Sequence, residues 1–290
     1  MSTKTLARIT KPGTPHFVGD GFRVHNFIPG SSTMQEMDPF IMLDYNSKYT
    51  FAPSQIPRGV GVHPHKGFET VTIAYKGKVE HGDSTGSSGV IHEGDVQWMT
   101  AAGGILHKEF HEKEWSKKGG EFQMVQLWVN LPAKHKHDPP GYQNLNNADI
   151  AKVVLPDDAG EVEVIAGEFN GQSGSAKTFS PVHLFNAKLK KNSKTEFSLP
   201  KDFTTAMLMI EGSAKVNDAE TVQQDHFAMF RRDGDTFTIE ALEDAVVLVL
   251  SGQQLKEPIA AHGPFVMNTR DELLQAFDDF NKGKFGFLED

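Results

Sequence analysis

Residues 63–77 read HPHKGFETVTIAYKG and contain both a histidine pair and a strand pattern. From Thr70 to Tyr75, Thr and Ala alternate with Val, Ile and Tyr, and the following Lys76-Gly77 is typical of a turn. Many short strands separated by turns indicate a β-sandwich or a β-barrel. Further runs of strand-forming residues occur at Val90–Ile91, Val96–Met99 and Gln123–Leu131.

The second half of the chain repeats this pattern after a turn-rich passage. The segment Ile73–Gly77 aligns with Leu208–Gly212, and Val96–Met99 aligns with Phe227–Phe230. We therefore expect two related β domains, with the alternative that any two β-rich segments share such patterns. The strand candidates of this half span 183–189, 205–210, 214–216, 227–230, 236–239 and 245–250.

One helix is well signalled near the end of the chain. Thr269 and Glu272 form a T-x-x-E capping box, and Gly283 is placed to end the helix. An apolar stripe between these signals predicts that the helix packs on a barrel in a structural role. The stripe consists of Leu273, Leu274, Phe277 and Phe280.

The composition excludes several kinds of chemistry. The chain has 290 residues, 13 histidines and no cysteine. Disulfides, thiolate zinc sites, iron–sulfur clusters and a cysteine nucleophile are therefore excluded, and any metal must be bound by His, Asp or Glu. The 29 Lys and Arg against 38 Asp and Glu give a net charge of −9, which argues against direct binding of nucleic acid.

Membrane segments are not expected. Residues 1–21 lack the apolar stretch of a signal peptide. The longest apolar run, Ala245–Leu250, is far shorter than the roughly 18 residues that a membrane helix needs. We expect a cytoplasmic, monomeric protein.

Two residue pairs predict a metal site. His63 and His65 are spaced i and i+2, which places both imidazoles on one face of an extended chain, and Pro64 restricts His63 to extended geometry. His107 and Glu109 form a second pair with the same spacing. If a small barrel brings the two segments together, three imidazole nitrogens and one carboxylate oxygen converge on one metal. The alternative is that one or more of these histidines is an ordinary core or surface residue.

This ligand set suits first-row transition metals. Four protein ligands on a six-coordinate ion leave positions for substrate and dioxygen, and His with carboxylate is typical of non-haem iron sites. Iron is therefore favoured, and Cu, Ni, Mn, Co and Zn remain alternatives.

Other motifs are weaker. His107 and His111 have the i, i+4 spacing of a helical zinc pair, but the glutamate stands at the wrong position between them. His135 and His137 are expected in an exposed loop. Gly82–Gly86 matches G-x-S-x-G, but no helix is predicted to follow, so a serine hydrolase is disfavoured.

Long blocks of the sequence resemble the pirin family, a branch of the cupin superfamily. They run from Asp38-Pro39-Phe40 to the final helix, so the resemblance covers nearly the whole chain. The blocks are 63–72, 94–101, 104–109, 126–131 and 262–269.

The resemblance implies an all-β bicupin, with two antiparallel jelly-roll barrels and a short C-terminal helix. It implies a metal-binding N-terminal barrel at residues 1–135, a linker and crossover segment at 136–180, and a metal-free C-terminal barrel with the closing helix at 181–290. It also implies that His63, His65, His107 and Glu109 bind one metal, usually iron. Glu69 stands where the general cupin motif H-x-H-x3-E has its glutamate, and we place it behind the ligands or in the barrel wall.

Pirin-like proteins imply two kinds of function. One is a quercetin 2,3-dioxygenase, which opens a flavonol with O2 and releases carbon monoxide, with Glu109 accepting the proton of the 3-hydroxyl. The other is an iron-binding regulator that contacts a transcription factor or a metabolic enzyme. A barrel that has lost activity ranks last. The expected apolar pocket walls are Phe51, Phe68, Trp98, Met99, Phe110 and Met124.

Overall fold

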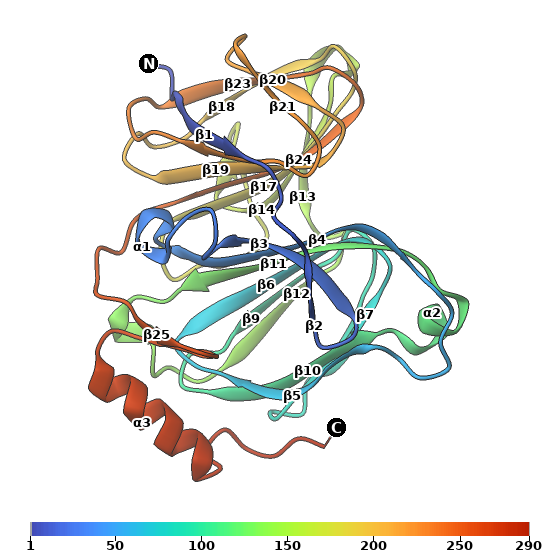
Figure 1. Cartoon of the computed structure of the whole chain (residues 1–290). Coiled ribbons are helices and arrows are strands. Elements are labelled where there is room, and N and C mark those ends of the chain that lie inside the picture. The colour runs from blue at the N-terminus through green and yellow to red at the C-terminus, as the bar shows by residue number, and fades with distance from the viewer. Residues whose placement is uncertain (1, 290) are drawn as a thin grey trace. The chain divides into compact units, whose positions relative to one another are not determined.

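A computed structural model describes residues 2–289 of the chain (Figure 1). Strands make up 51% of it and helices 10%, which confirms the all-β prediction. The described chain folds into two compact units. We call residues 14–147 with 255–289 the N-terminal barrel, and residues 2–13 with 148–254 the C-terminal barrel.

Two antiparallel sheets build the N-terminal barrel. The larger sheet runs, in spatial order, β12 (Gly141–Leu145), β9 (Val96–Thr100), β6 (Phe68–Lys76), β11 (Gly120–Asn130), β4 (Phe40–Phe51), β3 (Phe22–Ile28) and β2 (His16–Val18). The smaller sheet runs β5 (Gly59–His65), β10 (Ile105–His111), β7 (Val79–Asp83) and β8 (Ser88–Ile91).

The remaining elements of this barrel are short. They are α1 (Met34–Met37), α2 (Lys113–Lys118), the 3-10 helix η1 (Ala133–His135), the hairpin β25 (Ala260–His262) with β26 (Phe265–Met267), and α3 (Arg270–Asn281). The capping box of Thr269 and Glu272 at the start of α3 is present as predicted. Among the described residues, none of the helices has the length and apolar character that crossing a membrane requires.

The C-terminal barrel has the same pair of sheets. The larger sheet runs β1 (Leu6–Thr10), β22 (Phe227–Phe230), β19 (Thr204–Glu211), β24 (Ala245–Gly252), β17 (Val182–Leu189), β14 (Gly160–Ala166) and β13 (Ala151–Val154). The smaller sheet runs β18 (Lys194–Ser198), β23 (Thr236–Ala241), β20 (Ala214–Val216) and β21 (Glu220–Val222). The remaining elements are the hairpin β15 (Glu168–Phe169) with β16 (Gln172–Ser173) and the 3-10 helix η2 (Pro156–Asp158).

The strand orders agree with the internal repeat. The predicted alignment pairs β6 with β19 and β9 with β22, and each pair occupies the same position in its sheet. The edge position that β12 fills in the N-terminal barrel is filled by β1 in the C-terminal barrel. The repeat in the sequence therefore reflects two copies of one topology.

Apolar side chains fill the C-terminal barrel. Its strands β18 and β23 are the counterparts of β5 and β10, which carry the histidines in the other barrel. Phe197 on β18 and Phe237 on β23 lie opposite each other with their rings stacked at 5.3 Å, and Ile239 is buried beside them. A packed hydrophobic core thus occupies the place of the histidine cluster.

The domain boundaries differ from those expected at 135 and 181. Residues 2–13 belong to the C-terminal barrel because β1 pairs with β22. The segment 136–180 is not a linker, since it supplies β12 to one barrel and β13 to β16 to the other. Helix α3 packs in the N-terminal barrel, against Phe265 and Met267 of β26. The pairing of β1 with β22 joins residues more than 200 positions apart in the sequence, which local patterns do not encode.

Candidate metal centre

Strands β5 and β10 bring three of the predicted histidines together. The strands pair antiparallel, with His107 directly opposite His63. The His107 ring centroid lies 4.1 Å from that of His63 and 4.7 Å from that of His65. One ring nitrogen of each residue lies within 4.8 Å of the others. The i, i+2 spacing therefore places His63 and His65 on one face as predicted.

The burial and hydrogen bonding of these imidazole rings are those expected of metal ligands. His65 and His107 are buried, and neither Nδ1 of His65 nor either nitrogen of His107 has a hydrogen-bond partner among the described residues. Burial lowers the pKa of both rings well below its ordinary value, which favours the neutral form that ligates metals. His63 donates from Nδ1 to the Gly61 carbonyl at 2.8 Å, which leaves Nε2 available.

Glu109 lies beside the three histidines and is held by hydrogen bonds. Gln126 donates from Nε2 to both carboxylate oxygens, at 3.3 and 3.0 Å, and the Thr72 hydroxyl donates at 3.5 Å. Burial raises the pKa of the Glu109 carboxyl. The group of converging ligand atoms contains the three histidines without Glu109, and the register with β5 shifts between His107 and Glu109. The carboxylate is thus adjacent to the centre but engaged with Gln126.

A cavity of about 300 Å³ opens on this cluster. His63, His65 and Glu109 line it from one side. The opposite walls come from alternate residues of neighbouring strands, because side chains two apart share a face of a sheet. These residues are Phe22 and Val24 on β3, Met42, Asp44 and Asn46 on β4, and Met124, Gln126 and Trp128 on β11, together with Val18 on β2. Val60 lies on β5, on the side of the histidines.

The predicted walls were mostly wrong, because Met124 is the one member of the set that lines this cavity. Phe68 lies behind it, stacked on Trp128 at 4.1 Å and 5.2 Å from the His65 ring. Phe51 packs against His111, and Trp98 and Met99 are buried elsewhere in the barrel. The period-two pattern of residues 42–46 and 124–128 was the signal that identifies the actual walls.

His111 and Glu69 are not in the site. His111 donates from Nε2 to the Gly21 carbonyl at 2.8 Å and packs among aromatic rings, and burial lowers its pKa to about 4. Thr72 on β6 faces the site, because its hydroxyl bonds Glu109. Glu69 lies three residues earlier on the same strand, so its side chain points to the opposite face of the sheet. It accepts a hydrogen bond from Thr100 at 2.8 Å, and burial raises its pKa to about 7. Glu69 thus belongs to the barrel wall.

The remaining motifs are structural. His135 bonds Asp138 at 2.7 Å in the turn after η1. His137 is exposed as expected, whereas the intervening Lys136 is buried and donates to the carbonyls of Gly67 and Val266. Residues 82–86 comprise the end of β7 and the turn toward β8, with no helix after it, which rules out a nucleophile elbow.

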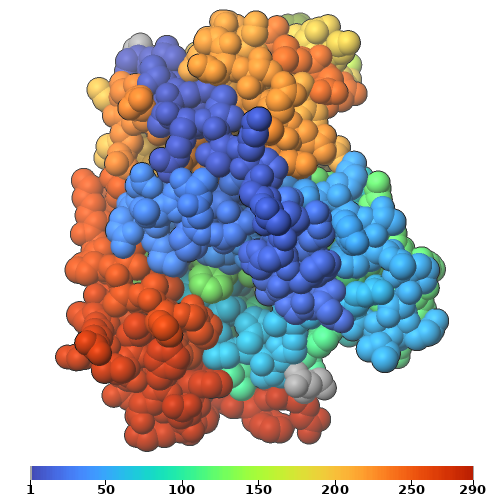
Figure 2. Space-filling view, in the orientation of Figure 1, coloured from blue at the N-terminus to red at the C-terminus, as the bar shows by residue number. Residues whose placement is uncertain are grey.

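The C-terminal segment, residues 255–289, covers one side of the N-terminal barrel (Figures 1 and 2). It also contacts the turn that follows His65. Lys66 donates from its backbone nitrogen to Pro264 at 3.3 Å, and its carbonyl accepts from Val266 at 3.0 Å. The buried Lys66 ammonium forms an ion pair with Asp279 of α3 at 2.9 Å. The strand that carries two histidines is therefore held by a segment about 200 residues later.

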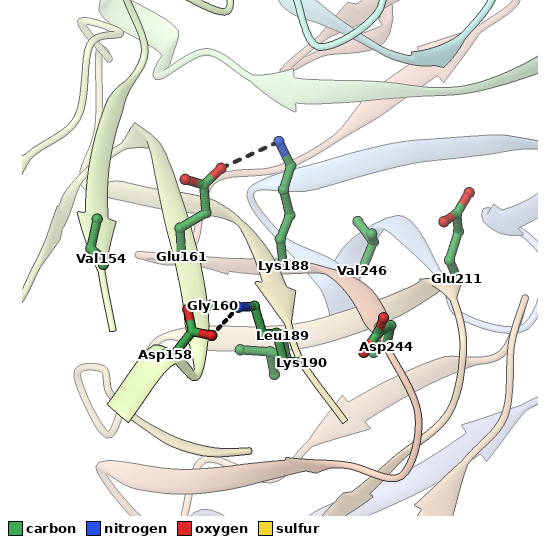
Figure 3. A pocket seen from close by; sticks show the side chains of 11 residues that line it. Val154, Asp158, Gly160, Glu161, Lys188, Leu189, Lys190, Glu211, Asp244 and Val246 are labelled. Atoms are coloured by element: carbon green, nitrogen blue, oxygen red, sulfur yellow. Dashed lines mark hydrogen bonds and ion pairs between the residues drawn. The ribbon is translucent and has the colours of Figure 1, made fainter. Parts of the chain in front are cut away.

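A larger hollow, of about 480 Å³, lies on the C-terminal barrel (Figure 3). Charged side chains line it, and they pair with one another: Lys188 with Glu161 at 3.7 Å, and Lys190 with Asp158. No histidine is among its lining residues, and both lining lysines are engaged in these ion pairs. The histidine cluster lines the smaller cavity of the N-terminal barrel instead.

Two barrels of one topology, with a histidine cluster in one and a hydrophobic core in the other, define a bicupin protein. The chain belongs to the pirin family. Residues 21–129 match the family described as Pirin, and residues 184–286 match the Pirin C-terminal cupin domain.

Individual relatives match over nearly their full length. A Pseudomonas aeruginosa protein named "Putative quercetin 2,3-dioxygenase" is 49% identical over 270 residues, 93% of this chain and 94% of that protein. A pirin-like protein of Caulobacter vibrioides is 37% identical, covering 98% of this chain and 100% of its own. The crystal structure of a quercetin 2,3-dioxygenase from Acinetobacter baumannii has a TM-score of 0.94 and 45% identity, with 99% of this chain and 100% of that chain covered.

Proposed function

We propose that the protein is a metal-dependent dioxygenase that opens a flavonol such as quercetin with O2 and releases carbon monoxide. The metal would be held by His63, His65 and His107, with Glu109 as a fourth ligand or as the base. Iron is the first candidate, because imidazole and carboxylate donors with open positions are typical of non-haem iron oxygenases. Cu, Ni, Mn, Co and Zn remain to be compared.

One observation carries this proposal. Buried imidazole nitrogens without partners converge at one side of an apolar cavity. Buried polar atoms in folded proteins are nearly always satisfied, so a group of unsatisfied nitrogens calls for a ligand such as a metal ion. The dioxygenase names of two relatives supply the reaction class.

The chain's own residues have distinct tasks in this reaction. When bound, the metal supplies Lewis acidity that lowers the pKa of a coordinated hydroxyl and a position for O2. The apolar walls, including Met124 and Trp128, bind the flat rings and exclude water. Glu109 takes the proton of the substrate's 3-hydroxyl on a carboxylate oxygen and returns it to the product.

Gln126 positions Glu109 for this step. It holds both carboxylate oxygens and in turn accepts a hydrogen bond from the Trp128 indole at 3.4 Å. When one oxygen of Glu109 takes the proton, Gln126 keeps a hydrogen bond to the other oxygen, so the carboxyl stays in place. Both atoms of O2 enter the products, and the flavonol loses one carbon as carbon monoxide.

The test is an aerobic assay of metal-loaded protein with quercetin. We expect loss of flavonol absorbance together with stoichiometric carbon monoxide. Glu109→Gln should retain bound metal but slow turnover by 10²–10⁴, the range typical of a general base. The absence of turnover with each of Fe, Cu, Ni, Mn and Co would contradict the proposal.

A further inference from the structure

Asn46 has an unusual position among the polar residues of the cavity. It lies on β4, faces the cavity, and is 2% exposed. Neither its Nδ2 nor its Oδ1 has a hydrogen-bond partner among the described residues. The side chain thus presents a donor and an acceptor, side by side, to the cavity.

The other polar groups on the same walls are engaged. Asp44 accepts from Asn26 Nδ2 at 2.6 Å, and Gln126 is bonded to Glu109. Asn46 has none of these contacts, and its partner across β11 is the apolar Met124. An amide buried without partners costs free energy, which a bound ligand recovers if it offers the missing hydrogen bonds.

The surroundings limit what such a ligand is. Phe22, Val24 and Met124 line the same cavity, so the body of the ligand must be apolar where it meets them. A phenolic hydroxyl donates and accepts at one atom, and two adjacent hydroxyls match both atoms of an amide. A hydroxylated aromatic ring therefore satisfies the walls and Asn46 together.

We propose that Asn46 is a specificity-determining residue that selects substrates with hydroxyl groups on their aromatic rings. This inference rests on the proposed function, because it assumes that the metal side of the cavity holds the 3-hydroxyl of a flavonol. Asn46 then recognises a second hydroxyl, on a ring away from the metal. The site disfavours a flavonol without that hydroxyl, because the amide stays unsatisfied while the bound ligand excludes water from it.

The experiment compares two ligands and two variants by titration of flavonol absorbance, with iron-loaded protein under anaerobic conditions so that no turnover occurs. Quercetin carries ring hydroxyls, whereas 3-hydroxyflavone has the metal-binding 3-hydroxyl alone. We expect the wild type to prefer quercetin. Asn46→Leu should reduce the preference by about tenfold or more, the effect of one hydrogen bond of about 1.4 kcal/mol.

Measurements of melting temperature distinguish a role of Asn46 in substrate recognition from a role in the stability of the fold. Because the amide of Asn46 makes no hydrogen bond to lose, Asn46→Leu should leave the melting temperature unchanged or raise it. The matched control is Ser47→Ala on the opposite face of β4, where the hydroxyl is bonded to His25 at 3.0 Å. That control should lower the melting temperature and leave the quercetin preference unchanged.

The outcomes are distinct. An unaltered preference in Asn46→Leu, or a marked loss of its stability, overturns the role of Asn46 while flavonol binding by the wild type stands. Equal affinity of the wild type for both flavonols overturns it as well. If the wild type binds neither flavonol, the proposed function fails, and the assignment of Asn46 fails with it.

Discussion

The ion pair between Lys66 and Asp279 offers a quantitative test of how the C-terminal segment supports the site. The side chains are 6% and 12% exposed, and the Lys66 ammonium also lies 5.5 Å from the centre of the Phe285 ring. Asp279→Asn removes the negative charge and leaves the buried ammonium without its counterion. Breaking a buried pair costs about 3–5 kcal/mol, and the amide oxygen retains one hydrogen bond of about 1 kcal/mol.

The expected loss is therefore about 2–4 kcal/mol in the free energy of unfolding. For a chain of this size, that lowers the melting temperature by roughly 5–10 °C. Urea unfolding and calorimetry measure both quantities. The control is Asp278→Asn on the same helix, which breaks the exposed pair with Lys282 at 2.7 Å and should cost less than about 0.5 kcal/mol.

The pH dependence supplies a second check. Hydrogen bonds from Lys284 and Lys66 lower the pKa of the Asp279 carboxyl below its ordinary 3.8. A depressed carboxyl pKa stabilises the fold above that ordinary value, and the contribution is lost as the pH falls below about 4. The gap between wild type and Asp279→Asn should narrow in that range. Equal destabilisation by Asp278→Asn and Asp279→Asn at neutral pH would refute the reasoning.

Three further predictions concern the same barrel. Replacing His63 and His107 together by Ala should abolish bound metal, measured by elemental analysis, with an unchanged circular dichroism spectrum; stoichiometric metal in that variant would mean that other residues are the ligands. Gly67→Ala should lower the free energy of unfolding in urea by more than about 3 kcal/mol, because the new Cβ would lie 1.9 Å from the Val266 carbonyl oxygen. Gly86→Ala is the control, because Gly86 has a similar positive φ but no atom within 4 Å of the new Cβ. It should cost about 1–2 kcal/mol, from backbone strain alone. Burial raises the pKa of Glu69 to about 7, so the folded state favours the protonated carboxyl, and this stabilisation is lost as the pH rises from 4.5 to 7. The free energy of unfolding of the wild type should therefore fall by up to about 3 kcal/mol in that range relative to Glu69→Gln, which keeps an acceptor for Thr100. Parallel plots of unfolding free energy against pH for the two proteins would contradict this.

Local patterns predicted much of this molecule. The runs 214–216 and 227–230 match β20 and β22 residue for residue, and the capping box at Thr269 starts α3 where expected. The spacing of His63 and His65 was sufficient to place both on one face, because alternation along a strand is a local property. The internal repeat could be predicted from the sequence as well, because equivalent strands of the two barrels keep similar local patterns.

The residues that line the cavity could not be predicted from local sequence patterns. Phe68 and Trp98 have the residue types of a pocket wall, but burial on a strand does not say whether a side chain meets a cavity or a neighbouring layer. Met42 and Gln126 line the cavity because β4 and β11 lie side by side, although the two residues are 84 positions apart in the sequence (126 − 42). Asn46 lacks hydrogen-bond partners because of the side chains packed around it, and these come from strands that are distant in the sequence.

The sequence by itself determined the all-β class, the repeat and the histidine pairs, because strand alternation, turns and i, i+2 spacing depend on neighbouring residues. The tertiary structure alone decided which barrel each end of the chain joins. It also decided that Gln126 holds Glu109, that Lys66 meets Asp279, and that Asn46 faces the cavity without a partner. Each of these depends on strand pairing and packing between distant segments, and the energy of a buried polar group is set by the atoms packed around it.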